Sequence, residues 1–166
     1  INGWRRWQST TDTALLDLEL PPGPLDNPQM VNVGNSWQCL NQRLPELEPG
    51  ARYRVRASIR TNGKVGGNIE IRDPGPNKLL AKIGTKAEQW EQVEQEFTAA
   101  PEGQTCELWL IHSTYKALGG VTWYDDIEVV KLDEPDKNLV VNAGFEHAAA
   151  DWRINSEYSV RGLADN

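Results

Sequence analysis

The sequence is poor in sulfur, in histidine and in positive charge. Its 166 residues include two Cys, one Met and two His, and 17 Lys and Arg face 24 Asp and Glu for a net charge of −7. Since nothing resembles a CxxC pair, we exclude a thiolate metal site and a dithiol redox motif. The negative charge argues against nucleic acid as a partner. No apolar run approaches the ~20 residues of a membrane span and no leader opens the chain, so we expect a soluble chain without a membrane partner.

The two cysteines leave two readings open. Cys39 and Cys106 each lie in an expected strand. The sequence is compatible with one disulfide between strands, if the protein is secreted, and equally with two buried free thiols.

Turn-forming residues and tryptophan are abundant. The chain has 10 Pro, 14 Gly and seven Trp. Apolar residues alternate in short runs separated by Pro and Gly, and no amphipathic helix of normal length is visible. One domain of this size can bury a sizeable core. We therefore predict an all-β fold, an antiparallel β-sandwich of two sheets.

The clearest strand follows the Pro49-Gly50 turn. Because side chains alternate between the faces of a strand, one set should point inward and the other outward. The inward set is Tyr53, Val55, Ala57 and Ile59, and the outward set is Arg54, Arg56, Ser58 and Arg60. The outward arginines could contact sugar hydroxyls or pair with acids across the strand.

A pair of carboxylates interrupts the last strand of this region, Val121 to Val130. Tyr124 and Ile127 both have the character of core residues, yet their odd spacing would place them on opposite faces. A β-bulge at Asp125 and Asp126 resolves this conflict. The two carboxylates are then either surface acids of an edge strand or ligands of a hard cation such as calcium.

Two tryptophans are expected on outward faces. Trp109 lies opposite the Leu108 and Leu110 face of its strand, and Trp37 alternates with the Leu40 side. An outward Trp gains little from its apolar body unless a flat ligand stacks on it or a loop covers it. For Trp109 a covering loop such as 113–120 is the alternative to a ligand.

An ordered set of motifs resembles carbohydrate-binding modules of families 4, 9 and 22. The set consists of Leu-x-Pro-Gly-x-x-Tyr at 47–53, a strand in which six residues separate Trp90 from Phe97, and a final strand with aromatic-x-Asp-Asp at 123–126. The resemblance covers roughly residues 30–130. It implies a jelly-roll sandwich that binds polysaccharide or oligosaccharide.

The motif with which such modules open stands at the wrong end of this chain. Asn138 to Glu146, followed by Trp152, resembles the family's first strand. We therefore divide the chain into a module lacking its usual first strand (1–131), a linker (132–137) and a segment (138–166) that either replaces this strand or opens a second module. Replacement within one chain gives a monomer, and replacement between chains gives a strand-swapped dimer. Modules in series are typical of multimodular secreted enzymes, so we expect a secreted or cell-surface protein.

The resemblance also implies site residues. In the family, the opening Glu and the final-strand Asp hold a structural calcium, which gives Asp125, Asp126 and Glu146 as metal ligands here. The ligand-binding residues that we predict are Trp37, Trp109, Arg56 and Gln38. Ile111 stands where xylan-binding members have a Glu, so xylan specificity is in doubt.

We expect non-catalytic binding of a β-linked polysaccharide, of the β-glucan, xylan or mannan type, that targets an appended glycoside hydrolase or related enzyme to its substrate. A different class of function is an adhesion or structural spacer repeat of a surface protein. A glycosidase or lyase on the same sandwich would need two carboxylates facing one cleft. Neither His112 nor His147 has a partner that the sequence identifies.

Overall fold

The regular structure is made of strands. The computed structural model describes residues 29–32, 38–73, 78–101, 104–112, 120–144 and 151–156. Within these residues no helix is long and apolar enough to cross a membrane. The strands are β1 (Gln29–Asn32), β2 (Gln38–Leu47), β3 (Arg52–Thr61), β4 (Gly67–Asp73), β5 (Lys78–Thr85), β6 (Glu91–Thr98), β7 (Gln104–His112), β8 (Gly120–Lys131) and β9 (Arg153–Ser156).

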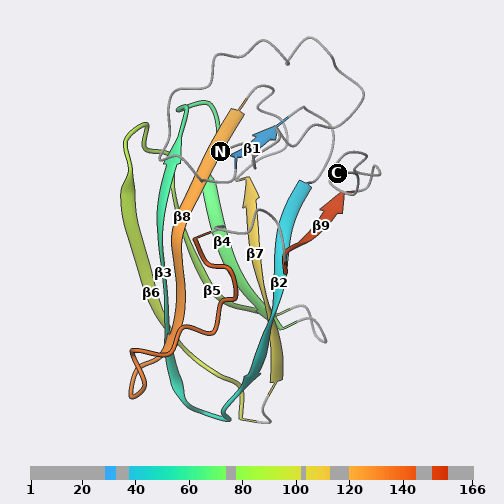
Figure 1. Ribbon diagram of the computed structural model, residues 1–166, viewed down its shortest axis with the longest axis vertical. Coiled ribbons are helices and arrows are strands. Elements are labelled where there is room, and N and C mark those ends of the chain that lie inside the picture. The colour runs from blue at the N-terminus through green and yellow to red at the C-terminus, as the bar shows by residue number, and fades with distance from the viewer. Residues whose placement is uncertain are drawn as a thin grey trace.

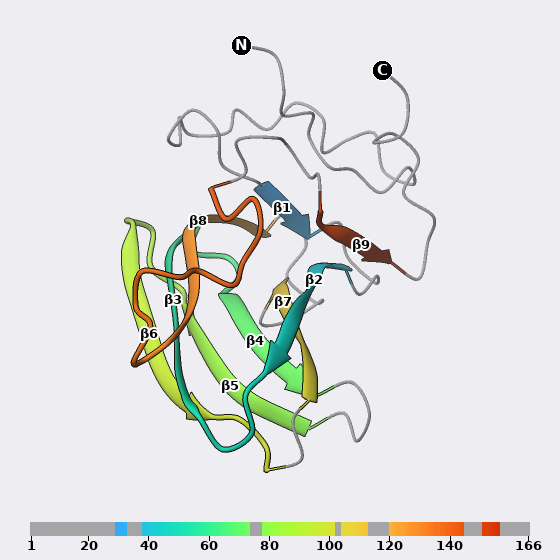
Figure 2. The ribbon, with the colours of Figure 1, turned by 60° about the horizontal axis from the view of Figure 1, so that its bottom comes forward.

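The strands form two antiparallel sheets (Figure 1). Within the described residues, sheet I has four strands in the order β1-β8-β3-β6, and sheet II has five in the order β5-β4-β7-β2-β9. Figure 2, which looks more nearly along the strands, shows the two sheets as separate layers. The predicted two-sheet antiparallel sandwich is confirmed.

The core lies between the inner faces of the sheets. From sheet I, the inward residues of β3 are all buried, as their alternation predicts, and Tyr53 stacks on Phe97 with ring centroids 5.7 Å apart. Sheet II contributes buried aliphatic side chains from its central strands: Leu40, Leu44, Ile69, Ile71, Leu108 and Leu110. Burial of these side chains is the main force that holds the sheets together.

The β-bulge at the Asp pair is confirmed. Arg56 pairs with Glu128 and Ser58 pairs with Asp125, so one residue of β3 stands opposite two of β8. Asp126 takes the left-handed backbone conformation, with φ of 50°. The extra residue lets Tyr124 and Ile127 both point into the core, where each is fully buried.

The two cysteines are buried and are not joined in a disulfide. Cys39 pairs with Ile111, which is five positions from Cys106 along β7. Five residues of strand span about 16 Å, well beyond the ~7 Å between Cα atoms that a disulfide can bridge. Burial raises the pKa of the Cys106 thiol to about 11. Of the two readings of the sequence, the disulfide is therefore wrong.

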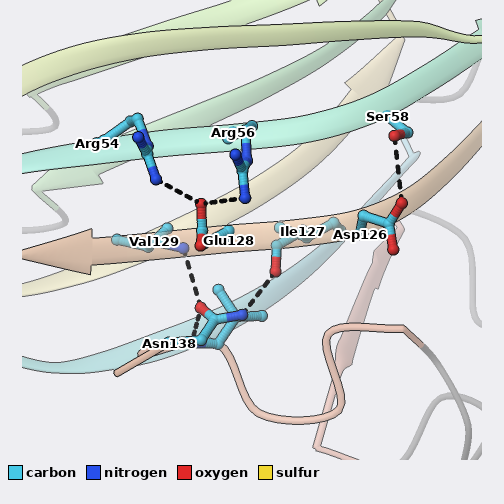
Figure 3. Close-up of polar contacts among 9 residues, drawn as sticks. Arg54, Arg56, Ser58, Asp126, Ile127, Glu128, Val129 and Asn138 are labelled. Carbon is cyan, nitrogen blue, oxygen red and sulfur yellow. Dashed lines mark hydrogen bonds and ion pairs between the residues drawn. The ribbon is translucent and has the colours of Figure 1, made fainter. Parts of the chain in front are cut away.

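Residues that follow β8 turn back onto the sandwich. Leu139 donates its N–H to the carbonyl of Val129 at 2.9 Å. The Asn138 side chain accepts from Val129 N at 3.0 Å and donates to the carbonyl of Ile127 at 2.9 Å (Figure 3). The segment thus lies along β8 just beyond the bulge.

The same segment then reaches sheet II. The buried Gln42 amide of β2 binds the backbone of Val141 twice, each bond 2.8 Å long, and Figure 1 shows this stretch in orange between β8 and β2. Val140 and Trp152 join the main core, and β9 pairs with β2. Glu146 lies outside the described residues, so its approach to the Asp pair stays a prediction.

Candidate functional site

The outer face of sheet II, the face turned away from the core, carries Trp109 near its middle. On β7, Trp109 alternates with the buried Leu108 and Leu110. The strand register places it between Asn41 of β2 and Glu70 of β4. Its side chain is partly buried. The ring therefore belongs neither to the core nor to a fully solvated surface.

Four side chains from β4 and β7 form a block on this face. Glu70 stands opposite Trp109, and Arg72 stands opposite Glu107. The indole Nε1–H of Trp109 donates to Glu107 Oε2 at 2.9 Å. The guanidinium carbon of Arg72 lies 5.6 Å from the centroid of the Trp109 ring, within the range of a cation–π contact. We call these four residues the Trp109 block.

Glu70, one of the two carboxylates of the Trp109 block, is buried and pairs with two cations. The Glu70 side chain is only 4% exposed. Arg72 binds Glu70 Oε2 through Nη2 and through Nε, the latter at 2.7 Å, and Lys82 of β5 lies 3.1 Å from Oε1. Because a buried charge is tolerated only when it is paired, these contacts fix the position of Glu70. Since Lys82 is 49% exposed, solvent screens its contribution.

Chemically, the outer face offers an aromatic plate surrounded by polar groups. Asn41, almost fully buried, lies beside Trp109 on β2, and Arg43 donates to Thr105 Oγ1 at 3.1 Å further along. Sugar rings present C–H faces to aromatic rings, and their hydroxyls need donors and acceptors at the edges. Trp109 provides such a ring, and the exposed Arg43 provides donors further along the same face.

Among the ligand-binding residues predicted from the sequence, only Trp109 lies on this face with a described side chain. Trp37 lies outside the described residues. Gln38 begins β2 and pairs with Ser156, but its side chain is not among those described. Arg56 lies on β3 in sheet I, where its Nη2 is 3.0 Å from Glu128 Oε2. The structure therefore does not bring Arg56 together with Trp109.

Two arginines of the β3 row, Arg54 and Arg56, are paired with an acid instead. Glu128 accepts from Arg54 at 3.1 Å as well as from Arg56 (Figure 3), and Arg52 pairs with Glu96. Of the two outcomes that the sequence allowed for this row, the structure shows ion pairs for Arg54 and Arg56, whereas Arg60 donates to the backbone carbonyl of Glu88 at 2.9 Å.

Sequence reasoning did not place Glu70, Arg72 or Asn41 in the site. Alternation puts Glu70 and Arg72 on an outward face, but it does not reveal that β4 neighbours β7. The spacing carried a partial signal. Glu70 and Arg72 are two residues apart, as are Glu107 and Trp109, so two neighbouring strands could place all four side chains on one face. These side chains come into contact only because β4 lies next to β7 in the sheet.

The predicted metal ligands are not assembled within the described residues. Asp125 Oδ1 accepts from the backbone N–H of Asp126 at 2.8 Å, and Ser58 Oγ donates to Asp126 Oδ2 at 3.4 Å. In the described part of the chain no three His, Cys, Asp or Glu side chains gather closely enough to hold a metal ion. Glu146, the third predicted ligand, lies outside the described residues, so the calcium site stays a prediction.

His112 has a structural environment at the end of β7. Its Nδ1 lies 3.1 Å from Thr122 Oγ1, and its Nε2 is buried with no hydrogen-bond partner among the described residues. Burial lowers the pKa of the imidazole to about 4. The ring is therefore neutral at physiological pH. The other histidine, His147, lies outside the described residues.

Comparison with known proteins identifies the fold. A solved structure described as "CBM4 structure and function" is 16% identical, with a TM-score of 0.50 over 62% of this chain and 80% of that chain. Another, described as "PbXyn10C CBM APO", is 17% identical, with a TM-score of 0.54 over 89% of this chain and 98% of that chain. No protein-family model and no curated protein matches the sequence. The likeness confirms the jelly-roll fold of carbohydrate-binding modules.

Proposed function

We propose that this chain binds a β-linked polysaccharide, without catalysing a reaction on it, through the outer face of sheet II around Trp109. The observation that carries this proposal is the partly buried Trp109 ring in the middle of a sheet face, set among charged and amide side chains. Ordinary sheet surfaces gain little from such a ring, whereas a pyranose gains a stacking partner. The fold shared with carbohydrate-binding modules supports the same function.

Binding rather than hydrolysis is favoured by how the carboxylates of this face are engaged. Glu70 is paired with Arg72 and Lys82, and Glu107 accepts from the indole of Trp109. A glycosidase needs one carboxyl that can donate a proton and another that can act as base or nucleophile. Both carboxylates here hold other side chains in place. In a larger secreted protein, the module would raise the local concentration of an appended enzyme on its substrate.

The test is affinity electrophoresis and calorimetry with laminarin, xylan, glucomannan and cellulose oligomers. We expect Trp109→Ala to weaken binding of the preferred glycan at least about tenfold, equivalent to about 1.4 kcal/mol. Its thermal midpoint should change little, because the ring lies outside the core. Trp90→Ala is the matched control, since Trp90 is also partly buried but packs against Trp123 of sheet I. Binding that survives Trp109→Ala, or failure of the intact protein to bind any of these glycans, would contradict the proposal.

A further inference from the structure

Two side chains contact the Trp109 ring, and one of them, Arg72, is itself anchored. Glu107, two residues before it on β7, accepts the indole N–H. Arg72, on the neighbouring strand, places its guanidinium over the ring. Rotation of the indole about either of its side-chain torsions would lose one or both contacts. The orientation of the ring is therefore fixed by its neighbours rather than by its own backbone.

Arg72 is in turn oriented by Glu70. The Nε and Nη2 atoms of the guanidinium both bind Glu70 Oε2, so the plane of the guanidinium is fixed by more than one N–H group. Glu70 is almost fully buried and is also bound by Lys82 from the opposite strand, β5. A side chain held this way presents one geometry, whereas a solvated arginine samples many.

We infer that Arg72, anchored by Glu70, is a positioning residue of the saccharide site, which orients Trp109 for stacking without itself contacting the sugar. This inference rests on the proposed function. Affinity for a shallow site depends strongly on what must be ordered during binding, so a plate that is already oriented binds more tightly than a rotating one. Lysine at position 72 would keep the charge, but it would lose the planar fork and the stacking surface.

The test compares Arg72→Lys with Lys82→Gln in the intact chain. Arg72→Lys should weaken binding of the preferred glycan about fivefold. Lys82→Gln also removes a cation from Glu70, but Lys82 is half exposed and lies on β5, which β4 separates from the Trp109 strand, so the affinity of this variant should stay within about twofold of the unmodified protein. Glu70→Gln removes the carboxylate that orients the Arg72 guanidinium, so it should also weaken glycan binding. This variant replaces Arg72→Lys in the test if Arg72→Lys does not fold.

A double-mutant cycle shows whether Arg72 acts through Trp109. In a Trp109→Ala background, Arg72→Lys should have no further effect on affinity. The indole N–H signal of Trp109 in a ¹H–¹⁵N spectrum, assigned by its loss in Trp109→Ala, should shift in Arg72→Lys and stay in place in Lys82→Gln. An equal loss of affinity in both backgrounds would show that Arg72 contacts the sugar directly and overturn the inference. So would an unchanged affinity or an unchanged indole signal in Arg72→Lys.

These outcomes separate the inference from the proposed function. If Trp109→Ala binds glycan as well as the unmodified protein, the proposed site is wrong. If Trp109→Ala loses binding and Arg72→Lys does not, the site stands and the positioning role of Arg72 is refuted.

Discussion

Two adjacent valines test whether the segment after β8 is part of this domain. Val140 is 6% exposed and lies in the main core, whereas Val141 is 55% exposed. Both residues are held by backbone hydrogen bonds that an alanine retains, because Asn138 accepts from Val140 N and Gln42 binds both backbone groups of Val141. Val140→Ala and Val141→Ala are thus the same chemical change at two levels of burial.

The expected difference follows from the buried area. Valine to alanine removes two methyl groups, worth about 0.8 kcal/mol each when fully buried, and leaves a small cavity. We expect Val140→Ala to lower the free energy of unfolding by about 2 kcal/mol and the melting temperature by about 4–8 °C. Val141→Ala should change the free energy of unfolding by no more than about 0.5 kcal/mol.

Urea unfolding followed by tryptophan fluorescence measures both variants, with circular dichroism to check that each keeps its strands. If residues from 138 on belonged to a separate module, neither substitution would alter the unfolding of this sandwich. Equal stability of the two variants would therefore refute the packing of Val140 and, with it, the idea that this segment replaces a first strand within its own chain. A loss of stability that depends on protein concentration would instead indicate exchange between chains.

Two further predictions concern pH and calcium. Because burial lowers the pKa of His112 from 6.5 to about 4, the neutral ring stabilises the fold fully above pH 6.5, and this contribution is lost as the pH falls towards 4. His112→Asn, which cannot titrate, should lose about 2 kcal/mol less than the unmodified protein between pH 7 and pH 5 in urea unfolding; parallel losses would contradict this. If Asp125, Asp126 and Glu146 hold calcium, EDTA should lower the melting temperature and excess calcium should restore it, with glycan binding retained. A melting temperature that EDTA leaves unchanged would rule out that site.

The features that could be predicted from the sequence are those set by neighbouring residues along one strand. The alternation of β3 gives its buried and exposed sides directly, because side-chain direction in a strand has a period of two. The bulge at Asp126 follows from two core residues at an odd spacing. Each of these inferences needs only the local chain and the requirement that apolar side chains be buried.

The composition of the site could not be predicted in the same way, because it depends on which strands are neighbours. Arg56 and Trp109 are both outward, yet they belong to different sheets. Glu70 and Arg72 meet Trp109 only because β4 pairs with β7 in one particular register. The distance between the two cysteines could not be predicted either, because it depends on the pairing of Cys39 with Ile111 across two strands.

Burial decides which outer face can serve as the binding face. Both sheets place a Trp under an arginine: Arg60 lies 5.5 Å from the ring of Trp123 on sheet I, as Arg72 lies 5.6 Å from that of Trp109 on sheet II. Trp123 is 1% exposed, belongs to a small apolar cluster with Val121, and has a buried indole N–H for which the described part of the chain offers no hydrogen-bond partner. A ring covered to this extent cannot meet a sugar unless its surroundings open. Trp109 keeps part of its surface exposed and has its indole N–H satisfied by Glu107. A sugar can therefore contact the exposed part of Trp109 without a new partner for the indole N–H and without opening of the sheet.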